Sequence, residues 1–297
     1  MRVAVIVNPI SGRAGRRTDA GRDRQQLAAD TLRALNVDAD VVLTNARGHG
    51  ADLARAFVAR SFDRVIAWGG DGTVNEVAGP LIGSNTALGI VPSGSGDGFA
   101  HGLDLPTGSG RALAAALQQP ITPVDVGWIG SRHFLNVCGI GFDAVVARGF
   151  NALKTRGPVG YVKGGLSLVW GYRAASYQVQ IGEARFDGPR FLVAFSNGRE
   201  YGNRLVLSAK ADPSDGWLDA VIVDAGTPWR QLWRARRLAV GAHRPAQGVH
   251  RIRVQQATIA GDLLVCHVDG ETFETRGSVE VKIQPKAILI AGAQLRT

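Results

Sequence analysis

The stretch Gly69-Gly70-Asp71-Gly72-Thr73 combines residue types and spacing that suit phosphate binding. An apolar run at 65–68 precedes it and predicts a buried strand, and apolar residues then recur at helical spacing over 74–82. A glycine turn between a strand and a helix directs backbone N–H groups toward a phosphate at the helix N-terminus. Glycine also lets the backbone approach the ligand without a Cβ in between. These residues therefore predict a phosphate-binding turn.

Asp71 is the unusual member of this turn, because a carboxylate beside a phosphate is repulsive. Its presence is explained if it acts through a bound metal ion or on a proton. A tight strand-to-helix turn with Asp71 as the helix N-cap is the alternative interpretation. The local sequence leaves both roles open.

The composition of the whole chain fits a soluble enzyme. With 297 residues, of which 45% are hydrophobic and 20% charged, the chain can form one large or two medium domains. No stretch approaches about 18 uninterrupted apolar residues, and the N-terminus is typical of a strand rather than a signal peptide. Cys138 and Cys266 lie far apart in the sequence and predict no disulfide framework, so the cytoplasm is the expected compartment.

The net charge of +9 is distributed unevenly along the chain. Acidic residues are absent from 144–182 and from 225–261, although both stretches contain several arginines. Such blocks suit an anionic surface of phospholipid, nucleic acid or a phosphorylated substrate. Because no helix-turn-helix, zinc-finger or ribonucleoprotein motif accompanies them, nucleic acid is not an expected partner.

One segment of the second block, 229–240, has the features of a membrane-docking helix. Trp229, Leu232 and Trp233 share a helix face, and tryptophan favours the bilayer interface. The arginines interleaved with them are Arg230, Arg234, Arg236 and Arg237. The alternative is that the tryptophans pack into a β-rich domain and the arginines are solvated.

Strands and helices alternate over the first 124 residues. Strands are expected at Val3–Val7, Ala39–Leu43, 65–68 and 88–91, and helices at 19–35, 51–60, 74–82 and 110–117. This order predicts an N-terminal parallel α/β nucleotide-binding domain with helices on both faces of the sheet. Ligands of such sheets bind beyond the carboxyl ends of the strands, where the segments 8–12, 69–73 and 92–97 would lie.

After Pro123 the pattern changes to short strands separated by turn residues. Strands are expected at 124–129, 133–138, 177–181, 190–196, 218–223, 252–260, 264–268 and 279–283, with helices at 159–172 and 229–240. We therefore expect one domain at 1–124 and a second, mostly-β and sandwich-like, lipid- or acceptor-binding domain at 125–285. A return of the C-terminal segment 286–297 to the N-terminal domain is left open.

Other nucleotide-binding motifs fit the sequence less well. The P-loop sequence and the protein-kinase motifs are absent. The segment 139–144 matches the dinucleotide fingerprint, which expects an acidic residue about 20 positions later. Here the next acid after Asp143 is Glu183, so a Rossmann site is disfavoured.

The ordered set of motifs resembles the diacylglycerol kinase catalytic-domain superfamily, specifically its soluble bacterial lipid kinases, with sphingosine and ceramide kinases as relatives. The resemblance covers nearly the whole chain and rests on the segments 8–12, 69–77, 92–100, 136–144, 215–219 and 269–271. The Gly-Gly-Asp-Gly-Thr sequence alone is shared with NAD kinases and phosphofructokinases, so the ordered series is the more specific signal. Two positions depart from the family: Ser95 replaces its threonine, and Asp97-Gly98 replaces its Asn-Asp pair.

The resemblance implies phosphoryl transfer from Mg-ATP to a lipid hydroxyl, a reaction that needs mainly positioning and charge neutralisation. By position, the residues holding the nucleotide would be Asn8, Thr44, Gly69, Gly70, Asp71, Gly72, Thr73, Asn75 and Ser95. A structural Mg²⁺ would be held by Asp212, Asp215 and the backbone of Trp217, and hard oxygen ligands suit this ion. An ordinary turn is the alternative interpretation of 212–216.

The resemblance also points to Glu271 as the proton acceptor, with Asp269 as a near neighbour and Asp71 ordering the catalytic Mg²⁺. The alternative for 269–270 is an Asp-Gly β-hairpin turn. Which of the two carboxylates, Asp269 or Glu271, is the base stays open.

We therefore expect a cytoplasmic lipid kinase that associates peripherally with membranes. Its expected partners are ATP and a lipid acceptor at an anionic membrane surface, with a homodimer left open and no nucleic acid. One alternative is an NAD-kinase-like enzyme with a soluble substrate. A second alternative is a non-catalytic, membrane- or phosphoinositide-binding relative.

Overall fold

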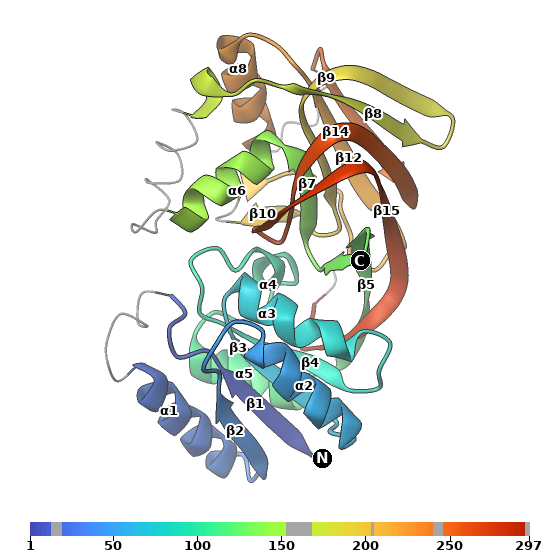
Figure 1. The fold of residues 1–297 in the computed structure, drawn as a ribbon. Coiled ribbons are helices and arrows are strands. Elements are labelled where there is room, and N and C mark those ends of the chain that lie inside the picture. The colour runs from blue at the N-terminus through green and yellow to red at the C-terminus, as the bar shows by residue number, and fades with distance from the viewer. Residues whose placement is uncertain (13–19, 153–167, 203–204, 240–245, 295–297) are drawn as a thin grey trace. The chain divides into compact units, whose positions relative to one another are not determined.

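A computed structural model describes residues 1–12, 20–152, 168–202, 205–239 and 246–294 (Figure 1). The chain divides into two compact units. Unit 1 contains Met1–Val124 together with Lys286–Thr297, and unit 2 contains Asp125–Pro285.

Unit 1 is built on a parallel sheet whose inner strands are mostly buried, while its edge strand is only partly buried. The strands are β1 (Val3–Val7), β2 (Ala39–Leu43), β3 (Arg64–Gly69) and β4 (Ala87–Pro92), in the order β2-β1-β3-β4. All neighbouring pairs are parallel. The end of β15 (Glu271–Ala291) adds a further parallel strand beside β4, where Ile290 pairs with Leu88. The carboxyl ends of β1, β3 and β4 therefore form one edge.

The helices of unit 1 cover both faces of this sheet. They are α1 (Ala20–Ala34), α2 (His49–Ala59), α3 (Asp71–Ala78), the 3₁₀ turn η2 (Gly79–Leu81), α4 (Gly98–Gly102) and α5 (Ser109–Gln118). The helices α1 and α5 pack against Val3, Val5 and Val7, while α2 and α3 lie side by side (Figure 1). This arrangement confirms the predicted α/β alternation, although α4 was not expected.

Unit 2 is dominated by an antiparallel sheet with the strand order β13-β12-β9-β7-β14-β15. Its longer strands are β5 (Ile121–Ile129), β7 (Val137–Gly141), β8 (Ala175–Ile181), β9 (Ala184–Ser196), β12 (Leu218–Asp224), β13 (Val249–Val254) and β14 (Gln256–Val268). The short strands are β6 (Arg132–Phe134), β10 (Glu200–Gly202) and β11 (Leu205–Val206). Its helices include α6 (Phe142–Ala152) and α8 (Pro228–Ala239).

The two faces of β12 pack into different cores of unit 2. Leu218, Ala220 and Ile222 enter the larger core, whereas Val221 and Val223 enter a second core with Leu232 of α8. The period of two along a strand explains this division.

Several predicted elements of unit 2 differ from the structure. The single strand expected at 133–138 is interrupted between β6 and β7, and the strand expected at 252–260 is divided between β13 and β14. The helix α6 was not expected. Of the helix predicted at 159–172, residues 168–171 are helical and 153–167 lie outside the described residues. Among the residues that the structure describes, no helix is long and apolar enough to cross a bilayer.

Gly89 of β4 allows α5 to pack on the sheet. A Cβ at this position would lie 2.8 Å from both the Ala116 Cβ and the Ile66 Cγ1. We expect Gly89→Ala to lower the free energy of unfolding by roughly 1–3 kcal/mol, because it overfills a close-packed contact. Urea denaturation measures this change.

The matched control is Gly110→Ala in α5, where no atom lies within 4 Å of the added methyl group. This variant should be more stable than the parent by roughly 0.4–1 kcal/mol, because the substitution reduces the entropy of the unfolded chain. Equal stability of the two variants would contradict the packing argument.

Candidate functional site

The strand–turn–helix arrangement at 69–73 is present in unit 1. Strand β3 ends at Gly69, Gly70 is extended, and α3 begins at Asp71. A Cβ at Gly69 would lie 2.4 Å from the Cβ of Thr73, so only glycine fits between the strand end and the first helical turn. The helix N-terminus is thus brought directly to the end of the strand, and N–H groups at a helix N-terminus can bind an anion.

The loop after β4 lies against this turn. The N–H of Ser93 donates to the carbonyl of Gly69 at 2.9 Å, and a Cβ on Gly70 would be 3.0 Å from the Cα of Gly94. The Asp97 carboxylate accepts the N–H of Gly94 at 3.0 Å. Burial raises the pKa of Asp97, which stands where the resembling family has asparagine. The Asp97 carboxylate therefore helps to fix the conformation of the loop after β4, which lies against the predicted phosphate-binding turn at 69–73.

The loop after β1 completes the edge. The Asn8 side-chain amide donates to Thr73 Oγ1 at 2.9 Å, and the Asn8 N–H donates to the carbonyl of Trp68 at 2.9 Å. The hydroxyls of Ser11 and Ser93 are hydrogen-bonded at 2.8 Å. Three segments that are distant in sequence are therefore joined by direct hydrogen bonds.

Arg24 of α1 is a buried residue of this edge that the sequence analysis missed. Its guanidinium donates to the carbonyls of Asn8 and Ser11, and to the Ser11 hydroxyl at 2.7 Å. Arg24 thus holds the 8–11 loop in place, and burial lowers its pKa. Its position within a charged helix carries no motif that could have identified it.

The other residues predicted to bind nucleotide lie at or near the same edge. The Asp71 carboxylate lies 3.1 Å from where a Cβ of Gly96 would be, so it faces the loop after β4. Thr44 follows β2, and its N–H donates to the carbonyl of Val7 at 2.9 Å. Ser95 is exposed in the loop after β4. The structure thus brings Asn8, Asp71 and Thr73 together, with Thr44 at the end of the neighbouring strand.

In unit 2, Asp269 and Gly270 form the turn between β14 and β15. Both have positive φ, 47° and 88°, as a type I′ hairpin turn requires. The Asp269 carboxylate accepts three consecutive backbone N–H groups, from Leu135 at 2.8 Å and from Asn136 and Val137 at 3.0 Å. This interaction explains the break between β6 and β7. It also fixes the position of Glu271, which begins β15.

A buried hydrogen-bonded chain supports the same turn. His267 contacts Asp143 Oδ2 through Nε2 at 3.0 Å and accepts the N–H of Gly270 at Nδ1 at 3.4 Å. A Cβ on Gly139 would lie 1.7 Å from Asp143 Oδ2 and 2.8 Å from His267 Nε2. Side chains of the protein therefore fill the space beside Gly139 in the segment that matches the dinucleotide fingerprint. The sequence analysis did not identify this pair, because its two members lie 124 positions apart in the chain.

The turn at 212–217 is folded by hydrogen bonds of its own. Asp212 Oδ1 accepts from the N–H and the hydroxyl of Ser214 at 3.0 and 2.7 Å. Asp215 accepts the N–H of Trp217 at 2.9 Å and forms an ion pair with Arg253. Buried Asp125, which sequence reasoning missed, accepts the N–H of Gly216 at 2.7 Å.

These contacts bear on the structural Mg²⁺ predicted at this turn. Among the described residues, no three or more His, Cys, Asp or Glu side chains form a group that could hold a metal ion. Asp212 and Asp215 accept hydrogen bonds from groups of the protein, so an ion at this turn would share their carboxylates with these donors, and the predicted Mg²⁺ site stays a prediction. We assign no chemical step to a metal at this position.

Comparison with known proteins identifies both units. The model of the diacylglycerol kinase catalytic domain matches residues 2–129. The model of the YegS C-terminal NAD kinase beta sandwich-like domain matches residues 136–292.

Relatives and solved structures agree with these matches. A "Probable lipid kinase YegS-like" protein of Chromohalobacter salexigens is 40% identical over 62% of this chain and 61% of its own length. A diacylglycerol kinase of Mycobacterium tuberculosis is 26% identical over 97% of this chain and 94% of its own length. A crystal structure of a diacylglycerol kinase from Bacillus anthracis, 18% identical, covers 98% of this chain and 96% of its own with a TM-score of 0.73, which shows a shared fold. The chain therefore belongs to the diacylglycerol kinase and YegS-like family of lipid kinases, and it is a kinase.

Proposed function

We propose that this kinase transfers the γ-phosphate of Mg-ATP to a hydroxyl group of a membrane lipid, such as diacylglycerol or a related lipid. The observation that carries the proposal is the convergence of the 8–12, 69–73 and 93–97 segments around the N-terminus of α3. This edge presents backbone N–H groups and hydroxyls to the nucleotide phosphates. Magnesium bound with ATP would neutralise phosphate charge, and Asp71 is the carboxylate at this edge suited to orient it.

In this proposal the two carboxylates of the β14–β15 hairpin have different roles. Asp269 accepts three backbone N–H groups, which makes it a positioning residue. Glu271 is the proposed proton acceptor for the lipid hydroxyl, because it lies beside the turn that Asp269 and His267 fix.

An NAD-kinase-like activity on a soluble substrate is the second candidate. It is favoured by the match of unit 2 to an NAD kinase beta sandwich-like domain. Labelled ATP offered with mixed micelles of diacylglycerol, monoacylglycerol, sphingosine, ceramide or phosphatidylglycerol, and separately with NAD, tests both proposals. Transfer to NAD with none to any lipid would replace the lipid-kinase proposal.

We expect Asp71→Asn to lower kcat by about 10²-fold or more, because it removes a catalytic carboxylate with little change in volume. The thermal unfolding midpoint should stay close to that of the parent. Asp52→Asn, an exposed acid on α2, is the control and should retain full activity. A folded and fully active Asp71→Asn variant would exclude the assignment.

The roles of the two hairpin carboxylates, Asp269 and Glu271, can be distinguished by measuring the stability and the activity of variants at each position. Asp269→Asn should destabilise the protein by roughly 1–3 kcal/mol, because it weakens charge-assisted hydrogen bonds to buried N–H groups. Glu271→Gln should abolish turnover while leaving the Kd for ATP within a few-fold, because the base acts on the acceptor. An active Glu271→Gln variant together with an inactive but stable Asp269→Asn variant would exchange the two roles.

A further inference from the structure

Among the described residues of unit 2, the three most exposed tryptophans come from two segments. Trp229 and Trp233 of α8 are 72% and 51% exposed, and Trp170 of the helical residues 168–171 is 51% exposed. The rings of Trp170 and Trp229 meet edge-to-face with their centroids 5.3 Å apart. We name these three residues the tryptophan patch. Clustered exposed aromatic surface of this kind marks an interaction site.

The orientation of α8 is fixed by its opposite side. Arg234 is buried and donates to the carbonyls of Asp224 and Gln247 at 2.7 and 2.8 Å. Buried Gln231 also donates to the carbonyl of Asp224, at 2.9 Å. Arg234 is therefore a structural anchor and does not contribute to an exposed cationic face, contrary to the sequence-based expectation. Because these anchors hold the helix, Trp229 and Trp233 point away from the core.

A basic pocket lies on the same face of the unit 2 sheet. Val221 and Val249 pack in the core that also contains Leu232 of α8 and Val169, the neighbour of Trp170. Arg251 and Arg253 follow Val249 at a spacing of two, so they project from this face. The β12–β13 register agrees, because Arg251 is opposite Val221 and Arg253 is opposite Asp219.

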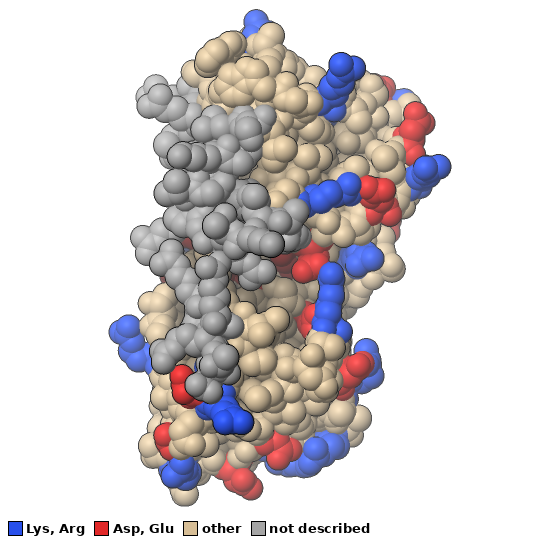
Figure 2. Space-filling model, turned by 60° about the vertical axis from the view of Figure 1, so that its left-hand side comes forward, with Lys and Arg blue, Asp and Glu red and all other residues tan. Residues whose placement is uncertain are grey.

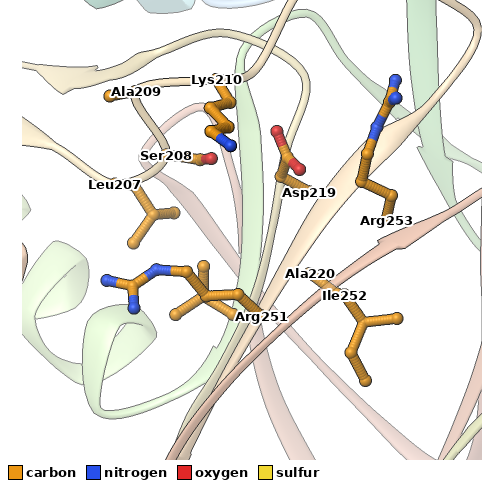
Figure 3. A pocket seen from close by; sticks show the side chains of 10 residues that line it. Leu207, Ser208, Ala209, Lys210, Asp219, Ala220, Arg251, Ile252 and Arg253 are labelled. Atoms are coloured by element: carbon orange, nitrogen blue, oxygen red, sulfur yellow. The ribbon is translucent and has the colours of Figure 1, made fainter. Parts of the chain in front are cut away.

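The pocket has a volume of about 280 Å³ and is lined by the cations of Lys210, Arg251 and Arg253, by the carboxylate of Asp219 and by apolar side chains. Its cations outnumber its one carboxylate. Figure 3 shows Lys210 directed toward Asp219, with Arg253 beside them and Arg251 next to Leu207. Arg253 is held by its ion pair with Asp215 and by the Trp217 ring, 5.4 Å away. This volume suits a phosphate-bearing headgroup rather than a whole nucleotide or an acyl chain.

The charge on the face drawn in Figure 2 does not identify a docking surface. In Figure 2, lysines and arginines are interspersed with acids over the visible described surface. By contrast, the chain from 225 to 261, which includes α8 and β13, contains no acidic residue. The positive charge of this stretch therefore complements an anionic surface. The tryptophan patch adds aromatic side chains of the kind found at bilayer interfaces.

We propose that this face of unit 2 docks on an anionic bilayer. The tryptophan patch enters the interfacial region, and Lys210, Arg251 and Arg253 hold the phosphate of a phospholipid headgroup. The choice of a bilayer as partner rests on the proposed lipid-kinase function. The docking surface would raise the local concentration of a membrane-borne acceptor.

Sedimentation with phosphatidylcholine vesicles, with and without phosphatidylglycerol, tests the proposal. The parent protein should bind the anionic vesicles more strongly, and added salt should weaken this binding. Lys210→Gln combined with Arg251→Gln should reduce binding to anionic vesicles by about fivefold for each cation removed. Trp229→Ala combined with Trp233→Ala should reduce binding to both vesicle types.

The controls are Arg55→Gln and Leu27→Ala, an exposed cation and an exposed apolar residue of unit 1. Both should bind vesicles within about twofold of the parent. Thermal unfolding of every variant establishes that it is folded. If the tryptophan pair fails to fold, Trp229→Phe with Trp233→Phe replaces it. If the cation pair fails to fold, the single variant Arg251→Gln replaces it and should bind anionic vesicles about fivefold more weakly than the parent.

Three results would overturn the proposal. In the first, the Lys210 and Arg251 variant binds vesicles as strongly as the parent, while the parent binds glycerol 3-phosphate saturably and the variant does not. The pocket would then be a site for a soluble anion. In the second, the parent is a dimer, and the Trp229 and Trp233 variant is a monomer that still binds vesicles. The tryptophan patch would then be an interface between two copies of the chain. Equal binding of the parent to neutral and anionic vesicles would exclude headgroup recognition.

Activity of the parent on a short-chain soluble diacylglycerol separates this proposal from the proposed function. Vesicle binding without transfer to any lipid would contradict the lipid-kinase function and leave docking intact. Transfer to the short-chain lipid without vesicle binding would contradict docking alone.

Discussion

The candidate nucleotide edge of unit 1 depends on backbone segments that lie too close together for side chains. Gly69 faces Thr73, and Gly70 lies against Gly94 across the two loops. Gly12, at a φ of 66°, would place a Cβ 2.0 Å from the carbonyl oxygen of Ser93. This close approach lets the ends of β1, β3 and β4 present N–H groups and hydroxyls around one helix N-terminus. The glycines therefore set the geometry, and Asn8, Ser11 and Arg24 hold it by hydrogen bonds.

In unit 2, the turns are held by hydrogen bonds of ionisable side chains instead of by close contacts between glycines. There, three ionisable side chains are satisfied by the backbone or by one another: half-buried Asp269 by three N–H groups, buried His267 by Asp143, and buried Asp125 by the N–H of Gly216. An unsatisfied group in these positions would cost the full desolvation penalty, so each interaction constrains both partners strongly. The hairpin that carries Glu271 is thus supported on two sides. Such support suits a group that must meet a hydroxyl proton within a narrow range of distance.

The sequence predicted the parts of the structure whose signals are local. Hydrophobic runs identified β1 and β2 with correct bounds, and the glycine motifs identified the turn between β3 and α3. The break between β6 and β7 could not be predicted, because the carboxylate that causes it lies more than 130 positions away. Arg24 was missed for the same reason, since its acceptors belong to another segment. The burial of Arg234 was also missed, because helical periodicity does not reveal which backbone carbonyls a side chain can reach.

Strand β15 begins at the hairpin of unit 2 and ends beside β4 in unit 1. Its last residues are part of the unit 1 core: Ile288 and Ile290 are buried, and the carbonyl of Ala287 accepts the N–H of Gly83 at 2.7 Å. Unit 2 is therefore an insertion within the chain of unit 1. During synthesis, the first 124 residues emerge without the strand that covers the open side of β4. Unit 2 can complete its fold on the ribosome, as domains generally do, whereas the sheet of unit 1 is completed only when residues 286–294 have been synthesised. Until then, the edge of β4 stays open to pairing with other chains, which makes the nascent protein sensitive to truncation and to aggregation.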